Sequence, residues 1–422
     1  MSYTGIELKK NVYEGEFSVQ IRDTYKREEL EFLTKPMLQK FSADHKLPTT
    51  QNRADLIKNI ENFANSSVDN ENVVQSWMDM ALKMGIKTCV VTKFFPGDVT
   101  NTKILEERMQ EKFPECKQEY ICKSIPNNEL KLIKYEFIEK ENQIVYAKFN
   151  FVINLVRAQR TYSETGDIIE FPVFVDMDFE NGFIISRCKS MTGLFRVVSG
   201  NKIDSSSAYK IENLMRDCEK QLISVINFEY ESTETSKNKF KKVIFKMLDA
   251  FTKTPKVIQD GMDRVADDRK KFVDNIFERL NLKVEGENYK DALYDIEIFV
   301  EKYLSIYCQD REIFMTDREA YPTKFLAQDN EFTKIQEQTG GANDPLQNKK
   351  AFFDSKKVVY SNKKCDRLNL CYQRKEKKYF GNNPFNVMLY LDRNSCMLKF
   401  TKAVEEGDIQ NVLSRIIQNY DV

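Results

Sequence analysis

Two aspartates at alternate positions, Asp176 and Asp178, are the residues of this sequence whose spacing could support a chemical reaction. They alternate with Val175, Met177 and Phe179, and alternate side chains of a β-strand point to the same face, so both carboxylates are predicted to share one face. Two such carboxylates can hold Mg²⁺ for phosphoryl chemistry, which would make the protein a carboxylate-metal nuclease or a nucleotidyl enzyme. The alternative, which the pattern favours, is the solvated face of a half-buried sheet.

Residue counts argue against several other kinds of active site. His45 is the only histidine, so a Ser-His-Asp site, a Cys-His site and a two-histidine metal helix are not expected. The nine cysteines include no Cys-x-x-Cys pair, and the equal gaps of Cys116 to Cys122 and of Cys365 to Cys371 lack the histidines of a zinc site. The favoured expectation is therefore a binding protein without a cofactor.

Residues 33–63 have the composition of two short helices joined by an extended turn. Thr34 can cap the first helix, and Leu47-Pro48 ends it because the residue before a proline is pushed out of the helical region. Asn52 can cap the second helix, in which apolar residues recur at helical spacing. The pattern predicts the order helix, extension, helix.

This stretch resembles the SAP domain, a small DNA-binding module with the same order of elements. The residues that carry the resemblance are Leu38, Phe41, Leu47-Pro48 and Arg53-Ala54-Asp55-Leu56-Ile57. Gln51-Asn52 stands where the family usually has a glycine before the basic residue. The resemblance implies that DNA lies against the start of the second helix, where free N–H groups favour phosphate. The implied contacts are Lys46, Thr50, Gln51, Asn52, Arg53 and Lys58.

The alternative for residues 33–63 is a helical hairpin that docks a protein. Five basic residues stand against three acidic ones there, so the local charge is only weakly positive.

A second nucleic-acid signal lies between residues 349 and 380, where eleven Lys or Arg residues stand against three acidic ones and aromatic residues are interleaved. Strands are predicted over 356–360 and 368–374. Basic charge for phosphates and rings for bases suit a surface that follows a single strand. A sheet edge protected by lysines is the alternative. The candidate contacts are Lys356, Lys357, Tyr360, Lys363, Lys364, Arg367, Tyr372, Arg374 and Lys375.

Several domains must position these residues, because 422 residues exceed one core of usual size. We predict a multidomain α+β fold. It comprises an N-terminal arm (1–23), a SAP-like hairpin (24–64), a mixed domain with an antiparallel sheet (72–200), a helical segment (206–308) and a basic β-rich domain with a C-terminal helix (309–422). The polar residues 64–70 predict a linker that leaves the hairpin mobile. Apolar stripes in the helical segment predict core or partner-facing surfaces, and thus protein partners or self-association.

The whole chain is electrically balanced, with 65 basic and 65 acidic residues, so nucleic-acid affinity must come from local patches. The first twenty residues include five charged side chains, so a signal peptide is not expected. No apolar run reaches the ~18 residues that span a bilayer. We expect a soluble intracellular protein without membrane contact, in a reducing compartment such as cytoplasm or nucleus, or within a virion. The favoured function is non-catalytic binding of double- or single-stranded DNA in a nucleoprotein assembly, and the alternative is a scaffold of a virus or mobile element.

Overall fold

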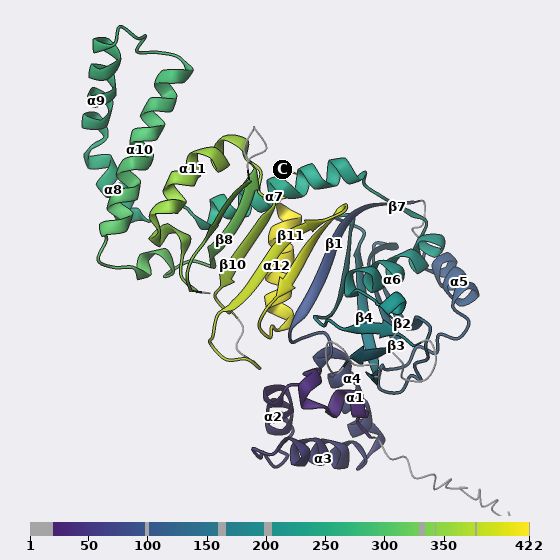
Figure 1. Cartoon of the computed structure of the whole chain (residues 1–422). Helices are drawn as coiled ribbons and strands as arrows, with labels where there is room; N and C mark the ends of the chain where they lie inside the picture. Colours follow the sequence, from purple (N-terminus) through teal and green to yellow (C-terminus); the bar gives the residue numbers. More distant parts are fainter. Residues whose placement is uncertain are drawn as a thin grey trace, which may run out of the picture.

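The computed structural model describes residues 20–97, 101–158, 166–197, 205–328, 334–341, 343–375 and 378–421. The fold is multidomain α+β, as predicted (Figure 1). A large twisted sheet forms the centre, a small helical unit lies below it, and a helical arm projects from its far end. Among the described helices, none has the length and apolarity needed to cross a membrane. The predicted arm at 1–23 falls mostly outside the described residues.

The N-terminal unit contains the predicted pair of helices. Helix α1 spans Asp23–Lys26, α2 Lys35–Asp44, α3 Arg53–Ala64 and α4 Val68–Ala81. The side chain of Asn52 accepts a hydrogen bond from the Ala54 N–H at 2.9 Å, so the predicted cap of α3 is present. Thr34 precedes α2 but its side chain makes no capping hydrogen bond.

The prediction of a mobile linker after the hairpin is wrong. Ser67 caps α4 directly after α3, and its hydroxyl accepts a hydrogen bond from the Asn70 N–H at 3.1 Å. The ring of Phe41 on α2 packs against Trp77 on α4, with 4.5 Å between the ring centroids. Both side chains are buried in the same core. The apolar face of α4 therefore holds the hairpin against the rest of the protein.

The sheet is antiparallel and has the order β2-β3-β4-β5-β1-β12-β11-β10-β8-β9. The antiparallel sheet predicted within 72–200 includes the meander β2 to β5. Strand β1 pairs with β5 on one side and β12 on the other, so the strands expected in 72–200 and 309–422 form one sheet. The strands of this order are β1 (Lys87–Pro96), β2 (Lys131–Lys140), β3 (Gln143–Ala158), β4 (Gly166–Asp178), β5 (Phe183–Lys189), β8 (Ala320–Gln328), β9 (Lys334–Gln338), β10 (Arg367–Tyr372), β11 (Phe385–Asp392) and β12 (Ser395–Phe400). Two short strands, β6 (Leu194–Arg196) and β7 (Phe228–Tyr230), pair with β3 and β1.

The sheet separates two hydrophobic cores. Alternate residues of β1 point to opposite faces, so Val90 enters the first core while Cys89 and Val91 enter the second. Helix α6 (Ile211–Ile226), with α5 (Thr102–Lys112) beside it, packs in the first core, and α7 (Thr233–Phe251) and α12 (Glu406–Gln418) pack in the second.

The arm consists of α8 (Lys256–Arg264), α9 (Ala266–Arg279) and α10 (Glu287–Tyr307), and α11 (Lys350–Asn362) packs against α10. The predicted strand at 356–360 is wrong, because these residues belong to α11. Phe352, Phe353 and Val359 are buried there, and packing of this helical face overrides the strand preference of the valines. The second predicted strand is confirmed as β10.

Candidate functional site

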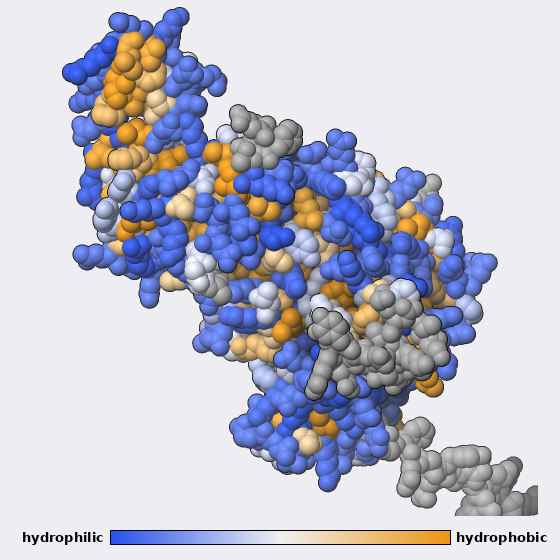
Figure 2. Space-filling model, viewed as in Figure 1, coloured by the Kyte–Doolittle hydropathy of each residue, from blue (hydrophilic) through white to orange (hydrophobic). Residues whose placement is uncertain are grey.

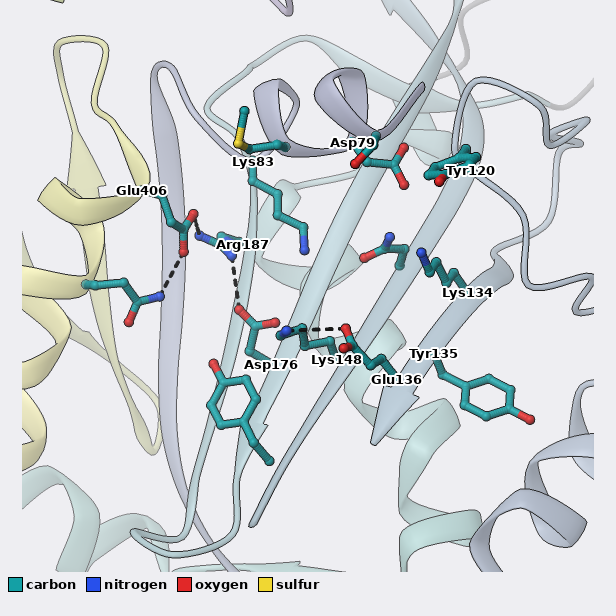
Figure 3. A pocket seen from close by; sticks show the side chains of 15 residues that line it. Asp79, Lys83, Tyr120, Lys134, Tyr135, Glu136, Lys148, Asp176, Arg187 and Glu406 are labelled. Atoms are coloured by element: carbon teal, nitrogen blue, oxygen red, sulfur yellow. Dashed lines mark hydrogen bonds and ion pairs between the residues drawn. The ribbon is translucent and has the colours of Figure 1, made fainter. Parts of the chain in front are cut away.

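A polar pocket of about 360 Å³ opens between the sheet, α4 and the start of α12. In Figure 3, side chains from β2 to β5 line the sheet side, and Asp79 and Lys83 reach in from α4 and the turn after it. Four basic and four acidic residues line this pocket. They are Lys83, Lys134, Lys148, Arg187, Asp79, Glu136, Asp176 and Glu406.

Arg187 forms ion pairs with two of the four carboxylates. Its guanidinium donates to Asp176 Oδ2 at 3.1 Å and to Glu406 Oε2 at 2.5 Å, and the residue is 2% exposed. Burial alone would raise the pKa of Glu406, but the Arg187 charge and the Gln410 amide lower it. The prediction that Asp176 lies on a solvated face is wrong, since Arg187 and Glu406 enclose it.

Asp178 shapes a turn outside this pocket. Its Oδ1 accepts the Asn181 N–H at 2.9 Å and its Oδ2 accepts the Asn181 side-chain amide at 2.7 Å. The turn at Asn181-Gly182 joins β4 and β5, and Gly182 has the positive φ of 64° that suits glycine. Asp176 and Asp178 therefore have separate structural partners, and the described residues contain no group of three or more His, Cys, Asp or Glu placed to hold a metal.

Two amines of the polar pocket have no acidic partner. Lys83 lies over the ring of Phe174 at 5.2 Å, and Lys134 lies over the ring of Tyr120 at 5.1 Å. Neither ammonium forms an ion pair within the described part of the chain. Burial lowers the pKa of Lys83, because it penalises the charged form. These two cations are available to an anionic group.

Asp79 is the carboxylate that remains beside these amines. It is 9% exposed, and its Oδ1 accepts the Ile121 N–H at 3.0 Å. Burial raises the pKa of Asp79 to about 6, although the hydrogen bond from Ile121 and the charges of Lys134 and Lys83 oppose the shift. The other pair, Lys148 with Glu136 at 3.2 Å, is internally neutral. Two free amines against one carboxylate favour a phosphate or carboxylate ligand.

A second hollow, of about 480 Å³, lies on the hairpin side of α4 and is called the aromatic hollow. The His45 ring packs against Phe41 there, tilted by 34° and with 4.3 Å between the ring centroids. Tyr379 also lines the hollow and lies beneath the Lys378 ammonium. Both hollows are lined by Ser76 and Met80. They therefore adjoin along α4, one offering half-buried rings and the other free amines.

The aromatic hollow joins the two stretches in which the sequence predicts nucleic-acid contacts. His45 belongs to the hairpin, and Lys378 and Tyr379 belong to the basic stretch at 349–380. The predicted contacts themselves lie elsewhere on both stretches.

In the hairpin, the Arg53 side chain is committed to the fold. Its guanidinium donates to the Lys26 carbonyl at 3.0 Å and to the Tyr25 carbonyl at 3.3 Å, where α1 ends, and burial lowers the pKa of Arg53. The hydroxyl of half-buried Thr50 accepts the Asn52 N–H at 3.0 Å. The remaining predicted contacts are exposed: Lys46, Gln51, Asn52 and Lys58.

In the basic stretch, Lys356 and Lys357 pair with acidic residues of helix α10. Lys356 pairs with buried Glu301 at 2.5 Å, and Lys357 pairs with Asp295 at 2.8 Å. The Tyr360 hydroxyl bonds to that of Thr252 at 2.7 Å. These three side chains tie α11 to its neighbours and do not form the predicted basic and aromatic surface.

Two further predicted contacts are buried in the structure. Tyr372 is 0% exposed and stacks on Phe385, so no base can reach its ring. Arg374 forms an enclosed ion pair with Asp408 and donates to the Asn383 carbonyl at 2.8 Å. Both predictions of nucleic-acid contact are wrong for this reason.

The last predicted contacts are spread over separate elements. Lys363 is exposed at the end of α11, and Lys364 donates to Asn238 at 3.3 Å. Arg367 on β10 lies over the Tyr390 ring at 5.8 Å, and exposed Lys375 donates to Asn411 at 3.1 Å.

Four residues of the polar pocket are not among those predicted from the sequence. They are Lys134 in β2, Arg187 in β5, Glu406 in α12 and Lys83 in the turn after α4. One signal was available for Arg187, which interrupts the apolar run of β5 and so required a buried partner. No protein-family model matches this chain, and no curated protein is similar to it in sequence.

Proposed function

We propose that this protein binds nucleic acid without cleaving it and holds a single-stranded segment of DNA along α4. The observation that carries the proposal is the meeting of the aromatic hollow and the polar pocket at Ser76 and Met80. Single strands are bound by rings that stack on bases and by cations that contact the backbone.

The aromatic hollow supplies the base contact. His45 and Tyr379 are its half-exposed rings, whereas Phe41 and Trp77 are buried behind His45 and hold it in place. Stacking of one base on such a ring is worth about 1–3 kcal/mol and depends little on sequence.

The polar pocket supplies the phosphate contact. Lys83 and Lys134 come from different elements and extend into the same space (Figure 3). A phosphate placed between them gains two charge-assisted hydrogen bonds without breaking an existing ion pair. Its negative charge would also favour protonation of Asp79.

The ion pair of Asp176 with Arg187 favours binding over hydrolysis as the role of the pocket. Its carboxylate neutralises Arg187, and Asp178 is engaged in a turn, so neither is prepared to hold a catalytic cation. The exposed Lys46 and Lys58 of the hairpin would add weak contacts to the same strand. We also propose that it acts in a reducing compartment inside the cell, where its nine cysteines, all free thiols in this structure, would remain reduced.

The test is fluorescence anisotropy of a labelled single-stranded oligonucleotide and of the matching duplex, each at 50 and 200 mM salt. We expect binding that prefers the single strand and weakens steeply with salt. The double change Lys83→Gln with Lys134→Gln should weaken binding at least tenfold, and Tyr379→Ala should weaken it severalfold.

The matched control is Lys46→Gln with Lys58→Gln, which removes two exposed amines from the hairpin. A smaller loss in this control supports the pocket as the main contact. A larger loss would indicate that the main DNA contact is at the start of α3, as the SAP resemblance implies. It would refute the pocket as the main contact. Absence of binding to either oligonucleotide at 50 mM salt would refute the function itself.

A further inference from the structure

The helical arm carries an apolar surface that the other described residues leave exposed. Figure 2 shows apolar residues gathered along the projecting arm at the upper left of the molecule. Nine large apolar side chains of this arm are at least 38% exposed. They are Val257, Phe272, Ile276, Leu280, Leu282, Val284, Phe299, Tyr303 and Tyr307.

Five of these residues, Val257 and four aromatic ones, line one groove between α8, α9 and α10, which we call the arm groove. It encloses about 820 Å³. Its exposed aromatic residues are Phe272 (54%), Phe299 (53%), Tyr303 (39%) and Tyr307 (72%). Surfaces of this kind on soluble proteins mark interaction sites.

The exposed rings supply a substantial part of the area that a stable dimer needs. At about 200 Å² for a whole aromatic side chain, the exposed parts of the four rings amount to roughly 400 Å². A standard interface buries about 800 Å² on each partner, so the rings alone supply about half of one side. Four exposed aliphatic side chains, Ile276, Leu280, Leu282 and Val284, extend the apolar surface along the end of α9 and the turn that follows it.

The arm groove carries one residue of each charge, so two copies of the groove can complement each other. Its two charged residues are Asp268, which is exposed, and Arg269, which have opposite signs. The Arg269 Nη1 is enclosed and has no hydrogen-bond acceptor among the described residues. Neither Asp268 nor Arg269 forms an ion pair within the described part of the chain, so both charges remain available to a second molecule.

We propose that the arm groove binds a second copy of this chain through a two-fold axis. Such an interface presents the same patch from both partners, and a patch with one acidic and one basic residue can then pair twice. Asp268 of each copy accepts from Arg269 of the other, and the aromatic ridges of each copy enter the groove of its partner. This inference is independent of nucleic-acid binding.

The test is sedimentation velocity of the full chain between 1 and 100 µM, with charge-reversal variants. We expect the unaltered chain to dimerise, and Asp268→Arg and Arg269→Asp each to weaken dimerisation at least tenfold, because like charges then meet. A mixture of these two variants should dimerise again, because one copy then carries two cations and the other two carboxylates. That recovery also shows that both variants fold.

A matched pair of phenylalanine changes tests the apolar part of the interface. Phe299→Gln should give a monomer, whereas Phe95→Gln, which alters a phenylalanine of similar exposure (51%) outside the arm, should leave the dimer intact. A chain that stays monomeric at 100 µM would overturn the proposal. So would a dimer that survives Phe299→Gln, or variants that fail to recover on mixing.

Discussion

The guanidinium of Arg187 and the carboxylate of Asp176 form an ion pair of 3.1 Å in which the two side chains are only 3% and 5% exposed. Removal of one partner from such a pair leaves the other charge buried without compensation, which costs far more than the pair itself contributes. The aspartate whose spacing suggested a metal site is thus required by the fold. A substitution of Asp176 can therefore distinguish a structural role in the ion pair from a catalytic role in a nuclease.

Asp176→Asn should therefore destabilise the protein by about 3 kcal/mol, since Arg187 would keep only Glu406 as a full charge partner. Urea unfolding followed by circular dichroism measures this. Asp178→Asn is the control, because that carboxylate serves an exposed turn and its loss should cost about 1 kcal/mol or less. Equal and small effects of both changes would contradict the structural role of Asp176. Mg²⁺-dependent plasmid cleavage lost in Asp176→Asn would restore the nuclease hypothesis.

Arg53→Gln should lower the free energy of unfolding by about 1.5 kcal/mol, because two backbone carbonyls at the end of α1 lose their charged donor. Lys46→Gln, also in the hairpin but exposed, should change it by less than about 0.5 kcal/mol. Urea unfolding of the two variants in parallel distinguishes them. If Arg53→Gln instead left stability unchanged and weakened DNA binding, Arg53 would be a DNA contact as the SAP resemblance implies.

Lys356→Met should destabilise the protein by about 3 kcal/mol, because Glu301 is 3% exposed and would lose its cation. The exposed Lys363→Met should cost less than about 0.5 kcal/mol. A double change of Lys356→Met with Glu301→Leu should recover most of the loss, since no buried charge remains. Thermal unfolding of these variants measures the difference. A double variant that is no more stable than Lys356→Met would contradict a cost from the unpaired Glu301 charge.

Local patterns were sufficient to predict most of the individual elements. The strands of the meander follow from β-branched and aromatic runs, and the turn at Asn181-Gly182 follows from the backbone freedom of glycine. The cap at Asn52 is likewise a local interaction. The helix α11 could not be predicted in this way, because burial of Phe352 and Phe353 against neighbouring elements determines it.

The candidate site could not be predicted because it depends on contacts between distant parts of the chain. Lys83 and Glu406 are separated by more than three hundred residues, and the pairing of β1 with β12 brings their elements together. The net positive charge of residues 349–380 does not show which groups of the fold the basic side chains contact. Lys356 and Arg374 use their charges on acidic groups of other helices, namely Glu301 and Asp408.

The raised pKa of Asp79 predicts a pH-dependent stability that a single substitution should remove. With a pKa of 3.8 when unfolded and about 6 when folded, the group binds protons more tightly in the folded protein. Folding is therefore unaffected by this group below about pH 4 and loses stability as the pH rises toward 6. Above that pH the cost is constant and on the order of 3 kcal/mol.

Asp79→Asn keeps an acceptor for the Ile121 N–H but cannot ionise. We expect it to raise the free energy of unfolding by about 1–2 kcal/mol at pH 8 and to give little gain at pH 4, because the uncharged amide still has to be buried. Urea unfolding at pH 4, 6 and 8 measures the difference between the variant and the unaltered protein. A gain that is the same at all three pH values would show that the Asp79 pKa is not raised, and a loss at pH 8 would show that the carboxylate charge stabilises the pocket.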